Sequence, residues 1–289
     1  MFDDDLNKIE KLLSNEIKNS KFLVIGGAGS IGQSVVLEIF KRNPKLLHVI
    51  DINENNLAEL VRDIRSSIGY IAGDFKTFAI DNNSIEFEAL IYQEKYYDYI
   101  LNLSALKHVR SEKDPFTLMR MLEVNVLNTL KTIDLVKNSK IKKYFSVSTD
   151  KAVTPINFMG ASKRLMELCL FEKSKEVNVS TARFANVAFS DGSILDSFRN
   201  RVFKKQPIAL PKDIKRYFIS PLEGGQLCLL STILGNNREI FFPKLNSDQH
   251  LIKIQYLCEA FLKSQGFEPF YCKNENEARK LVSFLPLEN

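Results

Sequence analysis

The chain has 289 residues, enough for one large domain or two small ones with a substantial core. Its 40 basic and 35 acidic residues leave a formal net charge of +5, and no basic run suggests a nucleic-acid-binding arm or a lipid-binding patch. The acidic start lacks the features of a signal peptide, and no stretch approaches the roughly 20 apolar residues that span a bilayer. The sequence therefore predicts a soluble cytoplasmic protein, without membrane insertion and without nucleic acid as a partner.

The cysteines and histidines give no metal-binding pattern. They are scattered and form no CxxC pair: Cys169, Cys228, Cys258, Cys272, His48, His108 and His250. Because a zinc framework requires closely spaced ligands, no metal is expected, and reduced thiols are the simplest interpretation.

An N-terminal helix is predicted over residues 1–20. Its hydrophobic residues fall on one face: Leu6, Ile9, Leu12, Leu13 and Ile17. The aspartates at positions 3–5 are candidate capping residues. We expect this helix to pack against the edge of a sheet or against a partner subunit.

Short apolar runs then alternate with amphipathic patterns. The predicted strands are 22–25, 48–52, 70–72, 99–103, 143–147, 180–184 and 239–242, and the predicted helices include 31–42, 57–66, 122–137 and 161–173. This alternation predicts an α/β fold with a doubly wound parallel sheet, which binds ligands beyond the carboxyl ends of its strands. Residues 21–186 are assigned to this Rossmann domain. Residues 187–289, which are turn-rich, are assigned mostly to a smaller substrate-binding lobe with some sheet-completing segments.

A glycine-rich turn follows the first predicted strand and opens a helical pattern. It reads Gly26-Gly27-Ala28-Gly29-Ser30-Ile31-Gly32. Glycines let backbone N–H groups approach a pyrophosphate at a helix N-terminus. An acidic residue, Asp51, ends the next strand, and the combination predicts a dinucleotide site. The expected contacts in the turn are Gly26, Gly29, Ser30, Ile31 and Gly32.

Further residues are candidates for the same site. A carboxylate at Asp51 accepts hydrogen bonds from the adenosine ribose and repels a 2′-phosphate, which favours NAD. The alternative is a helix-capping or turn aspartate. Asp74 is a candidate adenine contact or, equally, a turn residue. Asn102, Ser104 and Ala105 end the strand at 99–103, either beneath the cofactor or at an ordinary strand exit.

A hydroxyl, an acid and an amine follow the strand at 143–147 as Thr149-Asp150-Lys151. Lys163 lies four residues after Met159, so both point the same way on a helix. The spacing resembles the Tyr-x-x-x-Lys arrangement of short-chain dehydrogenases/reductases, in which the lysine binds the nicotinamide ribose and the tyrosine acts as base. Met159 stands in the position of the tyrosine. Taken alone, a lysine on a helix is more often a solvated surface residue.

Several motifs in order resemble the nucleotide-sugar 4,6-dehydratases of polysaccharide biosynthesis, which are extended short-chain dehydrogenases acting on UDP-N-acetylglucosamine. The motifs are Asn102-Leu103-Ser104-Ala105-Leu106-Lys107-His108-Val109, Ser148-Thr149-Asp150-Lys151-Ala152-Val153, Met159-Gly160-Ala161-Ser162-Lys163-Arg164, Ala182-Arg183-Phe184-Ala185-Asn186-Val187 and Lys215-Arg216-Tyr217-Phe218. The methionine is similar to that of the branch that retains the configuration at C5. In Ser190-Asp191-Gly192-Ser193 an aspartate replaces the arginine often found in the family.

The resemblance implies a cycle in which NAD takes hydride from C4 of the sugar, water leaves from C5 and C6, and the hydride returns to C6. Asp150 would be the acid at the C6 hydroxyl, and Lys151, as a neutral amine, the C5 base. Thr149 would bind the C4 oxygen, and Lys163 would hold the ribose. Because the thioether of Met159 cannot accept a proton, the base for the C4 hydroxyl is left unassigned.

A UDP-sugar is the implied substrate. Arg216 is the candidate for its diphosphate, since a guanidinium matches phosphate oxygens in pairs. Lys107 and His108 could contact the sugar near C6, or be a solvated lysine and a packed histidine. Arg183 and Asn186 are further candidates, with a structural ion pair as the alternative for Arg183. Relatives pair through helices beside the sheet, so a homo-oligomer is expected.

Other interpretations of the whole chain remain open. Met159 either only fills space or marks a cofactor-binding protein without activity. A nucleotide-sugar 4-epimerase would share the fold and NAD, but it normally needs the tyrosine and has no use for the pair Asp150-Lys151. A redox sensor that binds NAD without turnover would tolerate substitution of both residues.

Overall fold

The computed structural model describes residues 2–211, 213–246 and 250–283. The chain divides into two compact units. The first comprises Met1–Phe184 and Pro221–Pro243, and the second comprises Ala185–Ser220 and Lys244–Asn289. The chain therefore leaves the first unit after Phe184, returns to it for one helix and one strand, and leaves it again after Pro243.

The first unit contains a seven-stranded sheet in the order β3-β2-β1-β4-β5-β6-β9, with every neighbouring pair parallel. Its strands are β1 (Lys21–Ile25), β2 (Leu46–Asp51), β3 (Asp74–Ala79), β4 (Tyr99–Asn102), β5 (Lys143–Val147), β6 (Val179–Ala182) and β9 (Glu239–Phe241). The order reverses between β1 and β4, and ligands on such sheets bind at the carboxyl ends beside this reversal. The predicted doubly wound α/β fold is confirmed.

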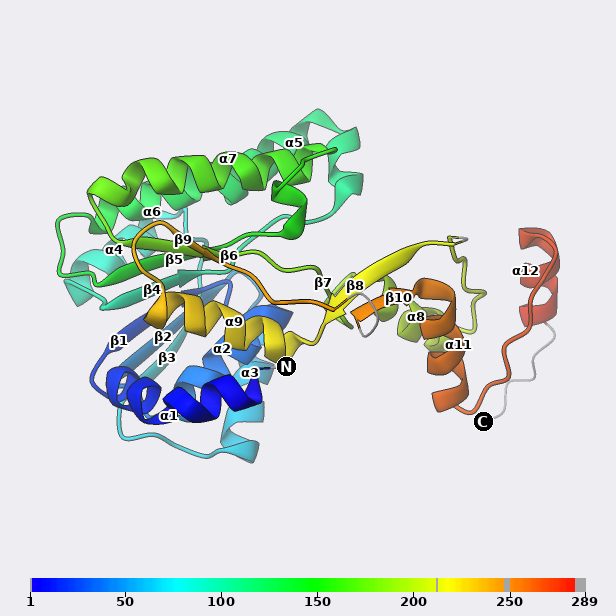
Figure 1. Cartoon of the computed structure of the whole chain (residues 1–289), viewed down its shortest axis with the longest axis horizontal. Helices are drawn as coiled ribbons and strands as arrows, with labels where there is room; N and C mark the ends of the chain where they lie inside the picture. Colours follow the sequence, from blue (N-terminus) through cyan, green and yellow to red (C-terminus); the bar gives the residue numbers. More distant parts are fainter. Residues whose placement is uncertain (1, 212, 247–249, 284–289) are drawn as a thin grey trace. The chain divides into compact units, whose positions relative to one another are not determined.

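Helices cover both faces of this sheet (Figure 1). On one side lie α4 (Ile85–Glu94), α6 (Asn128–Val136) and α7 (Phe158–Glu172), and on the other lie α1 (Asp3–Lys18), α2 (Ser30–Phe40) and α9 (Pro221–Leu234). Buried residues of the strands and of α4, α6 and α7 form one hydrophobic core, which includes Leu23, Ile100, Tyr144, Phe87, Ile133 and Met166. This core fixes the height of α7 above β5, which matters for the site described below.

Other helical segments are α3 (Glu54–Ser67), α5 (Pro115–Leu122) and the short turns η1 (Val109–Lys113), η2 (Glu123–Leu127), η3 (Asp150–Ala152) and η4 (Lys173–Lys175). The predicted helix over 122–137 is therefore interrupted, because η2 is a π-helical turn between α5 and α6. The predicted strand at 70–72 is wrong, because the strand in this part of the chain is β3, which begins only at Asp74. The aspartates at 3–5 do not cap α1, because the residue before the helix is Phe2.

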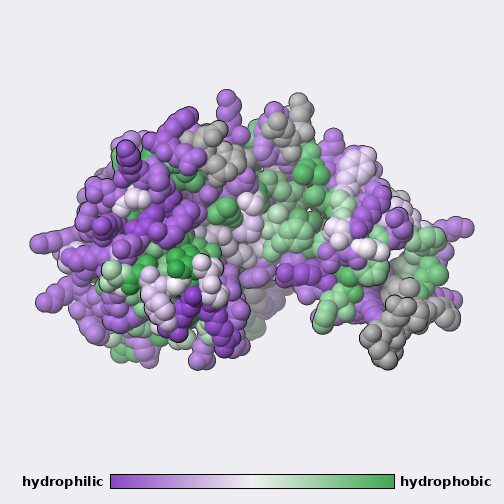
Figure 2. Space-filling view, turned by 90° about the horizontal axis from the view of Figure 1, so that it is seen from below, coloured by the Kyte–Doolittle hydropathy of each residue, from purple (hydrophilic) through white to green (hydrophobic). Residues whose placement is uncertain are grey.

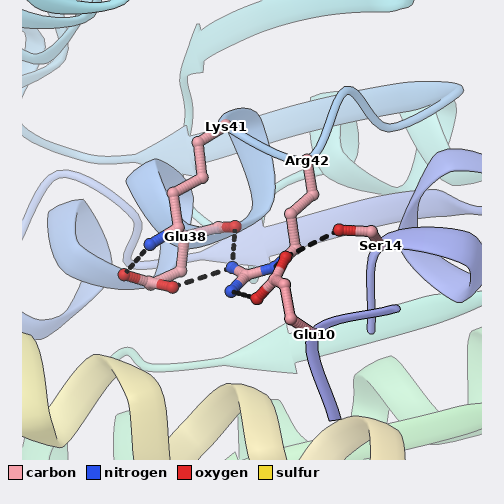
Figure 3. A network of polar contacts seen from close by, with 5 residues as sticks. All are labelled: Glu10, Ser14, Glu38, Lys41 and Arg42. Atoms are coloured by element: carbon pink, nitrogen blue, oxygen red, sulfur yellow. Dashed lines mark hydrogen bonds and ion pairs between the residues drawn. The ribbon is translucent and has the colours of Figure 1, made fainter. Parts of the chain in front are cut away.

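The helix α1 is held to α2 by a buried guanidinium (Figure 3). Arg42 donates to Glu10 through Nε at 2.9 Å and Nη2 at 2.6 Å, and to the Glu38 carboxylate through Nη1 at 2.8 Å. Leu13 and Ile17 of α1 are fully buried in the same unit. The N-terminal helix thus packs onto the first unit itself.

The second unit contains a three-stranded sheet in the order β10-β8-β7. Its elements are β7 (Asn186–Val187), α8 (Ile194–Phe203), β8 (Lys215–Ile219), β10 (Leu251–Lys253), α11 (Ile254–Ser264) and α12 (Glu275–Ser283). A small core of Leu195, Phe198, Ile254 and Cys258 joins α8 to α11. On the face seen in Figure 2, hydrophilic residues dominate and hydrophobic residues form separate patches. Within the described ranges, no helix is long and apolar enough to cross a membrane.

Candidate active site

The glycine-rich turn takes a backbone path that only glycine allows. Gly26 has a φ of +73°, and a Cβ atom there would lie 2.7 Å from the backbone nitrogen of Ser104. A Cβ atom at Gly32 would lie 2.2 Å from the carbonyl oxygen of Gly26. Gly29 is the N-cap of α2, which begins at Ser30. The first turn of α2 therefore lies at the carboxyl edge of the sheet, where the N-terminus of a helix can bind an anion.

A cavity of about 260 Å³ lies beside this turn. Its walls come from the carboxyl ends of β1 to β4 and from α5: Ile25, Gly26, Gly29, Ile50, Asp51, Ile52, Ile80, Asp81, Asn82, Leu103, Ser104, Ala105, Leu106, Arg120 and Val124. Of the residues predicted for the cofactor, it brings together Gly26, Gly29, Asp51, Ser104 and Ala105. We refer to it as the dinucleotide cavity.

Asp51 is fixed at the rim by two backbone donors. Its Oδ2 atom accepts a hydrogen bond of 3.0 Å from Ala28 N, and its Oδ1 atom one of 3.0 Å from Asn53 N. The N-cap of α3 is Asn53, so Asp51 does not cap that helix. Each carboxylate oxygen keeps a lone pair that can accept from a ligand hydroxyl.

Asp74 lies at the other end of the sheet. It opens β3 opposite Leu46, whereas Asp51 lies opposite Ala79 at the carboxyl end. Asp74 pairs there with Lys76 at 2.7 Å. The interpretation of Asp74 as an adenine contact therefore requires correction, because the register places it away from the dinucleotide cavity. The carboxylate that lines the cavity beside the carboxyl end of β3 is Asp81, which accepts a 2.7 Å hydrogen bond from Arg120.

Asn102 is the last residue of β4 and is buried. Its Nδ2 group donates to the hydroxyls of Thr129 at 3.2 Å and Tyr144 at 3.1 Å, while its Oδ1 atom accepts from the hydroxyl of Ser104 at 2.7 Å. Asn102 thus shapes the loop that carries Ser104 and Ala105.

The turn after β5 brings a hydroxyl, a carboxylate and an amine together. Thr149 Oγ1 donates to Asp150 Oδ1 at 2.9 Å, and Lys151 Nζ donates to the same oxygen at 3.3 Å. The side chains of Asp150 and Lys151 are 47% and 38% exposed, so the carboxylate and the amine are both open to solvent or a ligand. We refer to Thr149, Asp150 and Lys151 as the triplet.

Lys163 is buried on α7, and its Nζ atom donates a 3.1 Å hydrogen bond to the carbonyl oxygen of Val147. Burial lowers the pKa of Lys163 to about 8, although the charge of Glu167 acts in the opposite direction. It is therefore not a solvated surface lysine. Met159, four residues earlier, is also buried, and its backbone N–H donates to Glu112 Oε1 at 2.8 Å.

The predicted substrate contacts are spread over both units. Lys107 and His108 are exposed in the loop between β4 and η1. Arg183 is held in an ion pair, with Nε at 2.7 Å and Nη2 at 2.5 Å from the Glu167 carboxylate, as its alternative interpretation required. Asn186 and Arg216 belong to β7 and β8 of the second unit, where Asn186 Nδ2 donates to the carbonyl oxygen of Tyr217 at 3.1 Å.

The sequence analysis assigned no role to several residues around the site. Glu112, Glu167 and Asp81 are described above, and Asn125 holds Leu106 through both of its backbone polar groups, at 2.9 and 3.0 Å. For Glu167 the available signal is its spacing of four residues from Lys163, which places both residues on one helical face. No group of metal-binding side chains occurs among the residues that the structure describes.

Comparisons with known proteins agree with this fold. A family model described as polysaccharide biosynthesis protein matches residues 22–282. The uncharacterized membrane protein MJ1061 of Methanocaldococcus jannaschii is 33% identical over 265 residues, which cover 89% of this chain and 76% of that protein. The capsular polysaccharide biosynthesis protein CapD of Staphylococcus aureus is 28% identical over 260 residues. That match covers 88% of this chain but 42% of CapD, so the chain spans less than half of CapD's length.

Solved structures share the fold at low identity. Pen from Bacillus thuringiensis has a TM-score of 0.76 at 24% identity, over 88% of this chain and 77% of that one. DesIV from Streptomyces venezuelae, a dTDP-glucose 4,6-dehydratase crystallised with NAD, has a TM-score of 0.70 at 18% identity, over 93% and 92%. Because the family model spans most of its length, this chain belongs to the polysaccharide biosynthesis protein family.

Proposed function

We propose that the chain is an NAD-dependent nucleotide-sugar 4,6-dehydratase that acts on UDP-N-acetylglucosamine. The observation that carries the proposal is the triplet, an acid and an amine joined by a hydrogen bond of 3.3 Å at the carboxyl end of β5. Elimination of water needs both a proton donor and a proton acceptor, and these two groups supply them side by side.

The residues of the dinucleotide cavity fit NAD. The turn at Gly26 and the N-terminus of α2 suit a pyrophosphate, and Asp51 suits ribose hydroxyls while repelling a 2′-phosphate. Asp81 provides an acceptor at the same rim for an amino group. NAD, when bound, supplies the acceptor for a hydride from a sugar carbon and returns that hydride later. DesIV, which shares the fold, was crystallised with NAD.

Within this proposal Asp150 and Lys151 carry the elimination. Elimination in this proposal uses Lys151 as a neutral amine and Asp150 as a carboxylic acid, two groups that lie 3.3 Å apart. The amine then takes the C5 proton, and the acid protonates the departing C6 hydroxyl, so that one water leaves and the double bond forms between C5 and C6. Thr149, which is bonded to Asp150, lies ready to hold the C4 oxygen.

Lys163 would bind the nicotinamide ribose and lend positive charge beside the C4 oxygen. Its buried position next to the exit of β5 supports this role. Met159 has no proton to exchange, so we assign it to shaping the pocket. Lys107, His108, Asn186 and Arg216 remain candidate contacts for a UDP-sugar.

A nucleotide-sugar 4-epimerase is the second candidate, favoured by one observation. The UDP-glucose 4-epimerase of Rickettsia rickettsii is 28% identical over 233 residues, which cover 77% of this chain. Such an enzyme returns hydride to C4, and it has no need of an acid and an amine placed for elimination. The pair Asp150 and Lys151 therefore favours the dehydratase.

The deciding experiment is incubation with UDP-N-acetylglucosamine in D2O, with and without added NAD, followed by proton NMR. A dehydratase gives a C6 methyl signal with deuterium at C5, and the C5 configuration of the product tests retention. An epimerase gives a sugar inverted at C4 without a methyl signal. Bound nucleotide without any product, with this and other nucleotide sugars, would establish the sensor interpretation instead.

A further inference from the structure

The carboxylate of Glu167 joins three elements of the first unit at one buried point. Glu167 lies on α7 and is fully buried. It accepts a hydrogen bond of 2.6 Å from the hydroxyl of Ser148 at the exit of β5. It also accepts 2.7 and 2.5 Å hydrogen bonds from Arg183, the residue that follows β6. We propose that Glu167 is the positioning residue of the candidate active site, which fixes the triplet relative to Lys163; this inference rests on the proposed function.

The first connection acts on the triplet. Ser148 directly precedes Thr149, and its backbone N–H donates to the Ala182 carbonyl oxygen at 2.9 Å. Two residues later, the N–H of Asp150 donates to the Phe184 carbonyl oxygen at 3.2 Å. The exits of β5 and β6 are thus bonded to each other on both sides of Thr149. Because the carboxylate of Glu167 binds both Ser148 and Arg183, it fixes the position of this turn.

The second connection acts on the helix. Lys163 and Glu167 are four residues apart and lie on one face of α7. Lys163 Nζ binds the carbonyl oxygen of Val147, and Glu167 binds the side chain of Ser148. Two side chains one helical turn apart on α7 therefore bind two consecutive residues at the end of β5. A single hydrogen bond would let α7 rotate about it, whereas two hydrogen bonds fix both the direction of the helix and its distance from the strand.

The pKa of Glu167 is consistent with hydrogen bonds that persist at neutral pH. Burial alone would raise the pKa of the Glu167 carboxyl, but the hydrogen bonds from Arg183 and Ser148 bring its pKa below the ordinary value. Glu167 is therefore ionised at neutral pH and accepts from all its donors, including Arg164 at 3.1 Å. Since a buried ion pair adds little net stability over apolar residues of equal volume, its geometry is the better reason for its presence.

The test compares Glu167→Gln with a matched control, Glu38→Gln. Glu38 is also a buried carboxylate, 2.8 Å from the guanidinium of Arg42, but it serves α1 and α2 (Figure 3). Both variants should lose thermal stability. Only Glu167→Gln should lower kcat, by about 10- to 100-fold with little change in KM, because misplaced catalytic groups slow chemistry more than binding. An equal loss of kcat in both variants, or no loss in Glu167→Gln, overturns the proposal.

Ser148→Ala is a less disruptive substitution that can be used if Glu167→Gln does not fold. It removes the link to the strand exit and leaves the pair of Glu167 and Arg183 in place, so we expect a smaller fall in kcat at nearly unchanged stability. Crystal structures of these variants give a readout that needs no substrate. In Glu167→Gln, or in Ser148→Ala where that variant alone folds, the triplet should be displaced relative to Lys163. In the control Glu38→Gln it should not move. A triplet that keeps its position in the Glu167→Gln or Ser148→Ala structure overturns the proposal. Absence of turnover in the unmodified protein would instead refute the dehydratase, and the structures would still decide the positioning role.

Discussion

The amine of Lys163 lies 3.1 Å from the carbonyl oxygen of Val147, the last residue of β5, and donates a hydrogen bond to it. This contact links the helix that carries the candidate ribose-binding lysine to the strand that delivers the triplet two residues later. Both parts of the proposed chemistry therefore share one backbone frame. Because the amine is buried, its ionisation is coupled to the folding of the protein.

That coupling predicts how stability depends on pH. Burial lowers the pKa of Lys163 from 10.5 to about 8 in the folded protein. Between these values the unfolded chain holds a proton that the folded protein has released, so the contribution of Lys163 to stability rises with pH through this window and is constant below it. Across the whole window from about pH 8 to 10.5, this adds about 3 kcal/mol to the free energy of unfolding.

Urea denaturation at pH 7.5 and 9.5 measures this contribution when Lys163→Met is the reference. The free energy of unfolding of the unmodified protein, relative to the variant, should be greater at pH 9.5. Because other groups titrate in both proteins, only the difference between them is informative. An identical pH dependence in the two proteins would contradict a depressed pKa at Lys163.

Asp150→Asn and Lys151→Met should each slow elimination strongly while the dinucleotide stays bound. General acid and base groups contribute about 10²- to 10⁴-fold to a rate, so the methyl signal in the NMR assay should fall by that factor. NADH titration should give the affinity of the unmodified protein, because the triplet lies outside the lining of the dinucleotide cavity. Lys140→Met, at an exposed lysine, is the control and should keep full activity. Near-normal rates in both triplet variants would refute the assigned roles.

Asp51→Asn should weaken NADH binding about 10-fold or more, since a hydrogen bond to a charged group contributes about 1.5–3 kcal/mol. It should also narrow the preference for NADH over NADPH, because the negative charge that repels a 2′-phosphate is gone. Fluorescence titration with both nucleotides measures this. Asp74→Asn is the matched control, with the same change at the opposite end of the sheet. Equal effects of the two substitutions would show that Asp51 does not read the ribose.

The contrast between Asp51 and Asp74 shows what the sequence could and could not predict. The strands β1, β2, β4 and β5 are almost entirely buried and read as continuous apolar runs, so their ends were readable. The strand β3 lies at the sheet edge, mixes polar and apolar residues and has no buried residue, and the apolar residues before it misled the prediction. A shift of a few residues in one edge strand was enough to exchange Asp81 for Asp74.

The role of Arg183 shows a second limit. Periodicity and motif spacing describe neighbours along the chain, and they predicted that Met159 and Lys163 share one face of a helix, which the structure shows to be buried. The bond between Arg183 and Glu167 joins residues 16 positions apart on different elements. Only the packing of α7 against β5 and β6 makes that contact, so the sequence could offer an ion pair for Arg183 as an alternative but not its partner.

The glycine-rich turn gives a final prediction about local structure and function together. Gly26→Ala would strain a backbone with a φ of +73° and press a Cβ atom to 2.7 Å from the nitrogen of Ser104. Gly69→Ala is the matched control, because Gly69 also has a positive φ, +97°, but open space around it. The control should cost about 1–3 kcal/mol of backbone strain and leave NADH affinity intact. Gly26→Ala should cost more and also weaken NADH binding, since it pushes apart the two loops that wall the dinucleotide cavity. Chemical denaturation and NADH titration separate these effects, and unchanged affinity in a folded Gly26→Ala protein would mean that the cofactor does not lie against this turn.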